Sequence, residues 1–385
     1  MEGGAYTNSS TTIGMDSVNE VITPREDVGM DKLAGELTAI EQQIAAAMTQ
    51  YLNAECVEYR RLASLQQQGW ANSAGDEFFK KRRHRADAAT KKTRRGFYKL
   101  MKQIAYELHD NVEAFFITTS NHDAPDILDM CMAPGGFLDV ALTECSNSAA
   151  LAFTLPLKDG GHQVLLSDNL RSRVKTRYAD ITMLAQDMGM ETIPDDRPDA
   201  RNFISRQLEP DQRFDLVICD GQVLRTQERL PYREGRENIR LSTVQLAMGL
   251  EHLREDGTMI ILLHNLGTYY TSDIVFSFRK FSTVRLFKPT KGHSMMGSFY
   301  MVASKVQRQN PLAIEAIEMW KQKWRVSTFG SAEDNLNLCR NGLEGVHVLL
   351  ETFGEELVQM GREIWQTQAD ALAEAPFIKN QGDKQ

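Results

Sequence analysis

The sequence predicts an α/β domain of the doubly wound, Rossmann-like type, with a mostly parallel seven-stranded sheet and helical extensions at both ends. Short apolar runs alternate with helical patterns from Asp126 to about Lys305, and this alternation is typical of parallel sheets covered by helices on both faces. Helical periodicity without strand-like runs precedes and follows that region. A turn with almost no side chains, APGG, follows the first apolar run.

Length and charge narrow the class of protein. With 385 residues and 42% hydrophobic residues, the chain can bury a full α/β core and carry further helices. A net charge of -8 excludes a protein that coats nucleic acid over its whole surface, but a local basic patch is compatible with it. The five cysteines show no CxxC pairing, so we expect reduced thiols and no metal site. The start of the chain does not resemble a signal peptide and no apolar run reaches membrane-spanning length, which predicts a soluble intracellular protein of the nucleus or the cytoplasm.

The N-terminal region is expected to contain a disordered tail and a long helix. Residues 1–28 are polar and lack periodicity, which predicts disorder. From Met30 to about Ala71, apolar residues recur every three or four positions, as in an amphipathic helix. Its apolar stripe would pack on the body of the protein or on a second copy of the chain. A helical partner protein and a homodimer are therefore both compatible with the sequence.

The most basic stretch of the chain runs from Lys80 to Lys102 and contains KKRRHR and KKTRR. It is a solvated helical face, a surface that binds RNA, or a bipartite nuclear signal. The density of charge in an otherwise acidic chain favours RNA as the partner. Phe97 and Tyr98 interrupt the charges and would either anchor the helix to the core or stack on bases.

Seven apolar runs predict the strands of the sheet. They are ILDMCM (127–132), LAFTLPL (151–157), ITMLA (181–185), FDLVICD (214–220), TMIILL (258–263), TVRLF (283–287) and SFYMVA (298–303). The helical pattern STVQLAMGLEHLRED precedes the fifth run, and Gly257 is its expected C-terminal stop. The loop between the last two runs is too short for a crossover helix, so we expect an antiparallel hairpin at one edge. After Pro311 the chain turns helical again.

The turn after the first strand is predicted to be a ligand site. Gly135 and Gly136 have no Cβ, which lets a ligand approach the backbone closely. Ligands of doubly wound sheets bind at the carboxyl ends of the strands, where this turn lies. The dinucleotide pattern GxGxxG is absent. A tight turn that binds nothing is the alternative.

The stretch DMCMAPGGF resembles motif I of the FtsJ/RrmJ-like RNA ribose 2'-O-methyltransferases, in which such a loop holds S-adenosylmethionine. GFYKLMKQI precedes it, and LAQDMG, FDLVICDG, QLAMGLEHLREDGTMIILL and KPTKGHSMMGSFYMV follow in the family's order. The resemblance implies a class I methyltransferase domain over 94–306, between a helical N-terminal region (29–93) and a C-terminal helical extension (307–385).

Enzymes of this family use a catalytic set of Lys, Asp, Lys and Glu. The resemblance implies that this chain has two of these four residues. Lys99 and Asp220 match the first lysine and the aspartate, whereas Leu262 and Ser298 stand where the family has the second lysine and the glutamate. Ammonium groups beside a ribose hydroxyl favour its alkoxide character, so these two departures weaken the expectation of the usual catalysis. His264 lies two residues after Leu262 on the same strand face and is the candidate replacement base.

The resemblance also implies a binding site for S-adenosylmethionine. The loop around its methionine end would consist of Asp129, Ala133, Pro134, Gly135, Gly136 and Phe137. Asp187 would accept a hydrogen bond from the adenine amino group, and Asp220 would close the pocket near the methyl group. Asp159, after the second strand, is the candidate for the ribose hydroxyls.

Three functions are open at this point. The first is a methyltransferase that acts on RNA with a rearranged catalytic set, in which Lys291 or His293 would also reach the cleft. The second is a catalytically degenerate pseudoenzyme that binds the cofactor or RNA as a scaffolding subunit. The third is a methyltransferase that acts on a small molecule or a protein.

Overall fold

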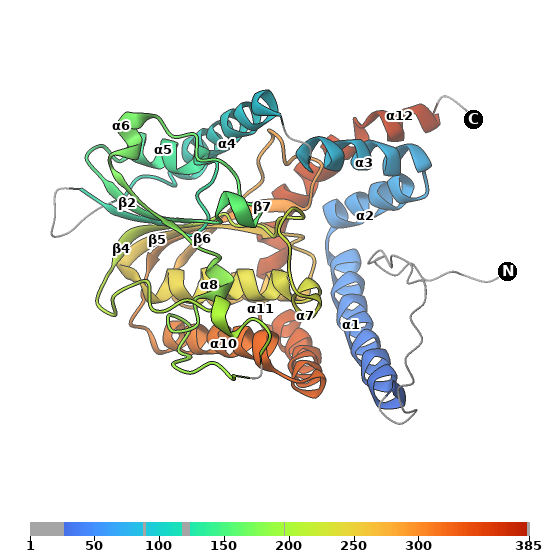
Figure 1. The fold of residues 1–385 in the computed structure, drawn as a ribbon. Coiled ribbons are helices and arrows are strands. Elements are labelled where there is room, and N and C mark those ends of the chain that lie inside the picture. Colours follow the sequence, from blue (N-terminus) through green and yellow to red (C-terminus); the bar gives the residue numbers. More distant parts are fainter. Residues whose placement is uncertain (1–26, 88–89, 118–123, 196, 383–385) are drawn as a thin grey trace.

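The computed structural model describes residues 27–87, 90–117, 124–195 and 197–382, and Figure 1 shows the chain as a ribbon. The predicted disordered tail over 1–28 lies outside these residues, apart from 27 and 28, which belong to the first helix. Within the described ranges, no helix is both long enough and apolar enough to cross a membrane.

A seven-stranded sheet forms the centre of the described chain, in the order β3-β2-β1-β4-β5-β7-β6. Strands β1 to β5 run parallel, whereas β7 pairs antiparallel with both β5 and β6. The predicted fold class, mostly parallel with an antiparallel last pair, is therefore confirmed. The strands are β1 (Asp126–Asp129), β2 (Ala149–Thr154), β3 (Val174–Tyr178), β4 (Phe214–Cys219), β5 (Leu253–His264), β6 (Thr283–Phe287) and β7 (Ser298–Val306).

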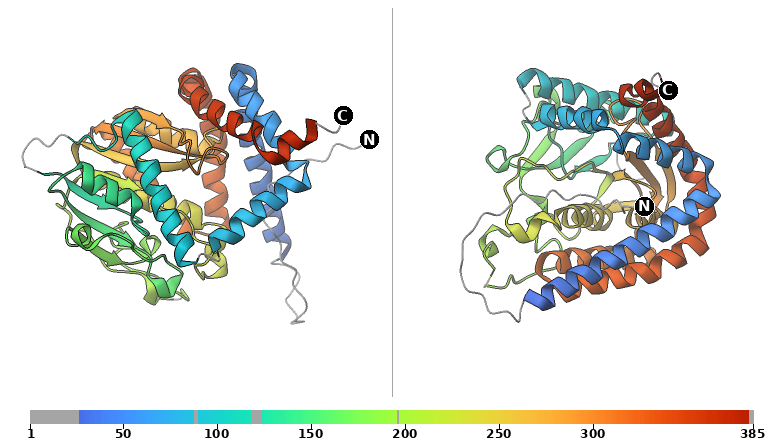
Figure 2. Two further views of the ribbon diagram at one scale, coloured as in Figure 1. Left: turned by 90° about the horizontal axis from the view of Figure 1, so that it is seen from above. Right: turned by 90° about the vertical axis from the view of Figure 1, so that its right-hand side faces the viewer.

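Helices cover both faces of the sheet (Figures 1 and 2). One face carries α4 (Lys91–Val112), α5 (Gly136–Glu144) and the short α6 (Asp168–Arg171). The other carries α8 (Glu237–Glu251), α9 (Tyr269–Arg279) and α10 (Pro311–Phe329), with the short α7 (Pro231–Glu234) before α8. Every residue of β4 is buried, which explains why its sequence is a continuous apolar run rather than an alternating one.

The N-terminal helices pack against a long C-terminal helix of the same chain. In α1 (Asp27–Glu55), Ile44, Met48 and Leu52 are buried, and the helix runs beside α11 (Ala332–Ala373) (Figure 2). The predicted single helix from Met30 to Ala71 is interrupted at Cys56, which is extended and fully buried, and α2 (Val57–Trp70) follows. The remaining helices, α3 (Ser73–Asp87) and α12 (Pro376–Gly382), pack on α2 and on each other.

Two sequence predictions about the sheet are wrong. The third strand is Val174–Tyr178, whereas the run 181–185 begins with the 3-10 turn Ile181–Met183 and is buried without pairing as a strand. Because β3 is an edge strand with exposed side chains, it lacks the apolar run that marks the inner strands. The helix before the fifth strand ends at Glu251, and Gly257 lies inside β5, where the pairing with β7 is irregular.

Candidate functional site

Two carboxyl groups lie at the carboxyl ends of the neighbouring strands β1 and β4. Asp129 is the last residue of β1, and Asp220 directly follows β4. Because the two strands are parallel neighbours, their carboxyl ends lie at the same edge of the sheet. Asp129 is 2% exposed and accepts a hydrogen bond from the backbone N–H of Cys131 at 3.0 Å. Asp220 accepts one from the hydroxyl of Tyr300 at 3.2 Å.

Neighbouring parts of the protein pack closely against the glycine turn. Gly135 has a φ of 101°, a left-handed conformation that disfavours other residues, and a Cβ there would lie 3.0 Å from Cγ of Leu166. A Cβ on Gly136 would lie 2.6 Å from the carbonyl oxygen of Tyr98 and 2.7 Å from Cβ of Met101, both on α4. We predicted that the two glycines leave room for a ligand. The structure adds a second reason for them, because α4 and the loop after β2 pack closely against this turn.

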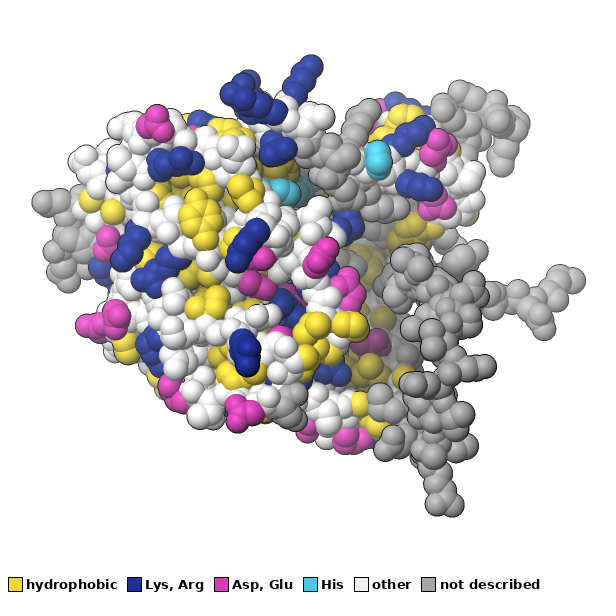
Figure 3. All heavy atoms as spheres, viewed as in Figure 1, with side chains coloured by type: hydrophobic (Ala, Val, Ile, Leu, Met, Phe, Trp, Pro, Cys, Tyr) yellow, Lys and Arg dark blue, Asp and Glu magenta, His cyan; other side chains and the backbone are white. Residues whose placement is uncertain are grey.

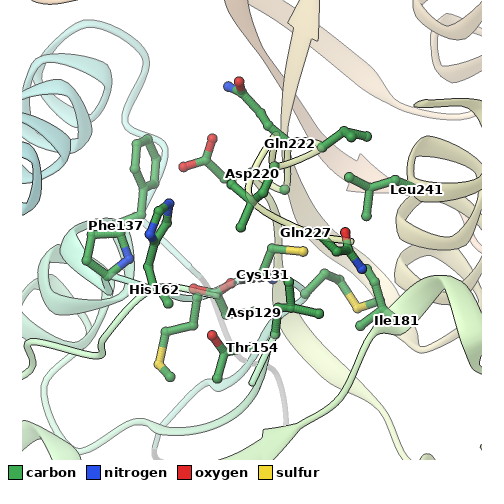
Figure 4. Close-up of a pocket in the computed structure, with 18 of the residues that line it drawn as sticks. Asp129, Cys131, Phe137, Thr154, His162, Ile181, Asp220, Gln222, Gln227 and Leu241 are labelled. Atoms are coloured by element: carbon green, nitrogen blue, oxygen red, sulfur yellow. Dashed lines mark hydrogen bonds between the residues drawn. The ribbon is translucent and has the colours of Figure 1, made fainter. Parts of the chain in front are cut away.

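A cleft of about 1200 Å³, its open mouth included, lies over these strand ends (Figure 4). Six of the residues predicted to bind the cofactor line it, together with the loops that follow β2, β3 and β4. Those six are Asp129, Ala133, Pro134, Gly136, Phe137 and Asp220, and Gly135 lies between two of them. Two residues that were not predicted also line this space, namely Thr154 at the end of β2 and His162 in the loop after it (Figure 4).

The two carboxyl groups of the cleft have raised pKa values. Burial raises the pKa of Asp129 to about 7. Burial, followed by the negative charge of Asp129, raises the pKa of Asp220 well above its usual range. A cation between the two carboxyl groups would lower both pKa values, and by linkage it would bind best to their ionised forms. His162 adds no competing positive charge at neutral pH, because burial and then the charge of Arg94 lower its pKa.

Asp180 is the acidic residue that follows the third strand in this cleft. It lines the cleft together with Ile181 and Thr182. Its carboxylate accepts hydrogen bonds from the backbone N–H of Thr182 at 3.0 Å and from Nε2 of Gln227 at 2.9 Å, and it pairs with Nη2 of Arg233 at 2.8 Å. Burial alone would raise the pKa of Asp180, but these partners outweigh burial and lower it. Asp180 is therefore held ionised and oriented.

Asp187, the residue predicted to contact adenine, lies elsewhere. Its carboxylate is 3% exposed and accepts hydrogen bonds from the backbone N–H groups of Gln207 and Leu208, both at 2.9 Å. The choice of Asp187 depended on the wrong third strand, and Asp180 is the first acidic residue after the actual strand. The alternation of Val174, Thr176 and Tyr178 is the sequence signal that could have located this strand.

Three further predicted residues lie away from the larger cleft. Asp159 is exposed at the end of the 3-10 turn Leu157–Asp159, and Lys99 is exposed on α4. His264 ends β5, where its Nδ1 lies 3.0 Å from Oγ of Ser298. Although this side chain is exposed, partial desolvation of its ring, followed by the charge of Lys288, lowers the pKa of His264.

His264 instead lines a second, smaller cleft of about 620 Å³, its open side included, between the ends of β4 and β5. The two clefts adjoin, because both are lined by the loop 221–223 and by Leu241. Asn238, Ser242 and His264 give the smaller cleft polar groups, while β4, β5 and α9 supply apolar walls.

The loop between β6 and β7 brings His293 to the larger cleft. Lys288, 4% exposed at the start of this loop, donates from Nζ to the backbone oxygen of Ser298 at 2.7 Å, and burial lowers its pKa to about 7. Arg82 on α3 donates to the carbonyl oxygen of Gly292 at 2.5 Å. Burial, followed by nearby positive charges, lowers the pKa of His293 to about 4. Its Nδ1 is buried and has no hydrogen-bond partner among the described residues.

Helix α4 carries the basic stretch to the mouth of the larger cleft. Tyr98 anchors the helix, because its hydroxyl donates to Asp139 on α5, and Lys102 pairs with the same carboxylate at 2.6 Å. Phe97 is 44% exposed and lines the mouth. The exposed side chains of 91–95 include four lysines and arginines, and Figure 3 shows Lys and Arg side chains along this upper part of the molecule. Of the two roles considered for the aromatic pair, Tyr98 has the anchoring one, whereas Phe97 is open to a ligand.

Comparison with solved structures gives distant likenesses only. Similar solved structures include PhzM, a pyocyanin biosynthetic protein (12% identity, 57% of this chain and 61% of that chain, TM-score 0.32). Another is an O-methyltransferase family protein from Burkholderia thailandensis (11% identity, 68% of this chain and 72% of that chain, TM-score 0.33). A third is TrmN from Thermus thermophilus (15% identity, 53% of this chain and 49% of that chain, TM-score 0.31). Such distant likenesses say nothing about substrate. No curated protein matches the chain in sequence.

A family comparison is more informative. The sheet order and the antiparallel β7 are those of a class I methyltransferase. The family model described as FtsJ-like methyltransferase matches residues 93–305, which include all seven strands except the last residue of β7. Since this match extends over more than half of the sequence, the chain belongs to the FtsJ-like methyltransferase family.

Proposed function

We propose that this chain transfers a methyl group from S-adenosylmethionine to RNA, at a ribose 2'-hydroxyl. The observation that carries the RNA assignment is the position of Phe97. It lies inside the most basic stretch of the chain and lines the cleft that holds Asp129 and Asp220. An exposed aromatic ring among lysines and arginines can stack on a base while the cations contact phosphates.

The residues of the larger cleft fit S-adenosylmethionine. Its ammonium and sulfonium groups are cationic, which matches the two buried carboxyl groups of Asp129 and Asp220. Ile181, Val223 and Leu241 offer apolar walls for an adenine ring. When bound there, the cofactor supplies an electrophilic methyl group. The protein's part is to orient it and to hold the acceptor in line with it.

The smaller cleft is where the acceptor would lie, because it adjoins the larger one at the loop 221–223. His264 stands at its edge as a neutral imidazole at pH 7, in keeping with its lowered pKa. If Nδ1–H donates to Oγ of Ser298, Nε2 is left as an acceptor for the hydroxyl proton. Leu262 stands in the place of the family's second lysine, and His264, which lines the same cleft, is the group that would accept the hydroxyl proton.

A binding subunit without turnover is the second candidate, and the same two positions favour it. Leu262 is 8% exposed and Ser298 is 4% exposed, so the places of the family's lysine and glutamate hold an apolar and a hydroxyl side chain. The double substitution Leu262→Lys with Ser298→Glu separates the candidates. Gain of ribose methylation in the double variant, with none in the native protein, would identify a degenerate enzyme that kept its cofactor site.

The first test is titration calorimetry of the purified protein with S-adenosylmethionine. Asp220→Asn keeps the shape of the side chain and should abolish most of the binding, whereas Asp159→Asn, an exposed carboxyl outside the larger cleft, should leave it unchanged. Incubation with labelled cofactor and total RNA, followed by digestion to nucleosides, then tests transfer. Native protein that binds no S-adenosylmethionine would overturn the enzymatic proposal, and binding without label in RNA would favour the binding subunit.

A further inference from the structure

Helix α10 lies beyond the region that the family model matches, yet it contacts the floor of the larger cleft. Trp324 on α10 is fully buried, and its Nε1 donates to the backbone oxygen of Thr182 at 3.0 Å. Thr182 lines the cleft beside Asp180. A residue outside the family-matched segment thus directly holds the backbone of the cofactor cleft.

A second contact runs from α10 through a buried arginine. Arg240 on α8 has no exposed surface, and its Nε donates to Oγ1 of Thr328 on α10 at 3.0 Å. Its Nη2 donates to the same backbone oxygen of Thr182 at 3.0 Å. One carbonyl of the cleft therefore receives hydrogen bonds from both α8 and α10.

The chain of ion pairs continues to Asp180. Arg240 pairs with Glu237 at 2.9 Å, Glu237 pairs with Arg233 at 2.5 Å, and Arg233 pairs with Asp180 at 2.8 Å. Two arginines and two carboxylates alternate, so the group is neutral as a whole. Separating one buried ion from its partner costs free energy, because the remaining charge is left unpaired. The complete network therefore keeps its side chains in one arrangement.

We infer that α10 is an integral part of the cofactor site, in which Trp324 and Thr328 are positioning residues that fix Asp180 and Thr182 through Arg240. Because the binding readout rests on the proposed function, the test needs a second readout that does not involve the cofactor. The alternative is that α10 only covers the face of the sheet, as many helices do.

Two matched pairs of variants separate these roles. Trp324→Phe removes the indole N–H and keeps an aromatic ring. Its control is Trp320→Phe, also on α10, where the ring is 2% exposed and stacks on Phe278 at 5.6 Å between centroids. Thr328→Val removes the hydroxyl that accepts the hydrogen bond from Arg240 and keeps the shape of the side chain. Its control is Thr328→Ser, which retains a hydroxyl.

The measurements are the affinity for S-adenosylmethionine by calorimetry, the thermal midpoint, and amide hydrogen exchange of Asp180–Thr182 in the free protein. For Trp324→Phe and Thr328→Val we expect affinity roughly five- to tenfold weaker and faster exchange at Asp180–Thr182. In Trp320→Phe and Thr328→Ser, the affinity for S-adenosylmethionine and the exchange rate at Asp180–Thr182 should stay at native values, even if the thermal midpoint falls.

Each outcome decides a separate question. Exchange and affinity that change equally in Trp320→Phe and Trp324→Phe would show that α10 acts only as cover and would overturn the inference. Native exchange at Asp180–Thr182 in Trp324→Phe would overturn it as well, whether or not the cofactor binds. Native protein that fails to bind S-adenosylmethionine overturns the proposed function, while the exchange data still decide whether α10 positions the cleft.

Discussion

Tyr300 and Asp220 are joined by a hydrogen bond of 3.2 Å between β7 and the end of β4. The ring of Tyr300 also stacks on Phe137, with 5.0 Å between centroids, so the hydroxyl is fixed in direction. This donation stabilises the ionised form of a carboxyl group whose pKa burial otherwise raises. Strand β7 of the antiparallel hairpin thus tunes a carboxyl group that lines the larger cleft.

We predict that the affinity for S-adenosylmethionine rises with pH. The raised pKa values of Asp129 and Asp220 mean that part of the protein is protonated near neutrality, and a cationic ligand has to displace those protons. Affinity should therefore be weakest below pH 6 and increase as pH rises past about 7. Calorimetry in two buffers of different ionisation enthalpy should show proton release.

The substitution Tyr300→Phe is the matched variant for this prediction. Loss of the donor raises the pKa of Asp220 further, so the rise in affinity should shift to higher pH. A pH-independent affinity without proton release would contradict the role given to the two carboxyl groups.

Gly136→Ala should destabilise the protein by about 1–3 kcal/mol. The new Cβ would lie 2.6 Å from the backbone oxygen of Tyr98, so α4 and α5 have to separate. Gly96→Ala is the control, because in the described part of the chain nothing lies within 4 Å of a Cβ built there. That variant should be stabilised by roughly 0.5–1 kcal/mol through helix propensity. Urea unfolding at one pH measures both, and equal effects would refute the close packing of the two helices.

Phe97→Ala should weaken RNA binding by about 1–3 kcal/mol, the usual contribution of a stacked base. Because Phe97 is 44% exposed, the thermal midpoint should change little. Phe116→Ala, which removes a ring that is 77% exposed outside the lining of the cleft, is the control. Fluorescence anisotropy with labelled RNA at two salt concentrations checks the prediction, and unchanged affinity would assign the basic stretch to another role.

Lys288→Met should cost more stability at high pH than at low pH. The folded-state pKa of Lys288 is about 7, whereas the unfolded value is about 10.4, so between these values the unfolded chain binds a proton that the folded protein does not. The free energy of unfolding of the native protein therefore gains up to about 1.4 kcal/mol per pH unit from this group, and the variant lacks that gain. Urea unfolding at pH 6 and pH 9 gives the difference. An equal loss at both pH values would mean that Lys288 is charged when folded.

The inner strands could be predicted from sequence, because they are buried on both faces and therefore apolar throughout. The edge strand β3 could not be found in this way, since Lys175 and Tyr178 are exposed and its neighbours in the chain, Ile181 to Ala185, are more apolar although they form no strand. Because of this error the expected adenine contact was placed at Asp187, which does not line the larger cleft, whereas Asp180 does. The break at Cys56 was also unpredictable, because no proline or glycine marks it.

The candidate site was partly predictable for a similar reason. Asp129, the glycine turn and Asp220 follow strands that were correctly located, so their convergence could be inferred from the parallel order. Arg233, Glu237 and Trp324 are joined to the cleft only by tertiary contacts, and no local pattern in the sequence marks them. His162 and His293 reach it on irregular loops, whose paths the sequence does not specify.

The pairing of α1 with α11 has a consequence for synthesis of the protein. The apolar stripe of α1, with Ile44, Met48 and Leu52, is synthesised well before the helix that covers it, α11 (Ala332–Ala373). All seven strands of the sheet are made in the interval. Until α11 emerges, this surface is exposed to solvent and to other nascent chains, as in other folds that close their ends late. The whole sheet can thus be synthesised while the apolar stripe of α1 is still uncovered.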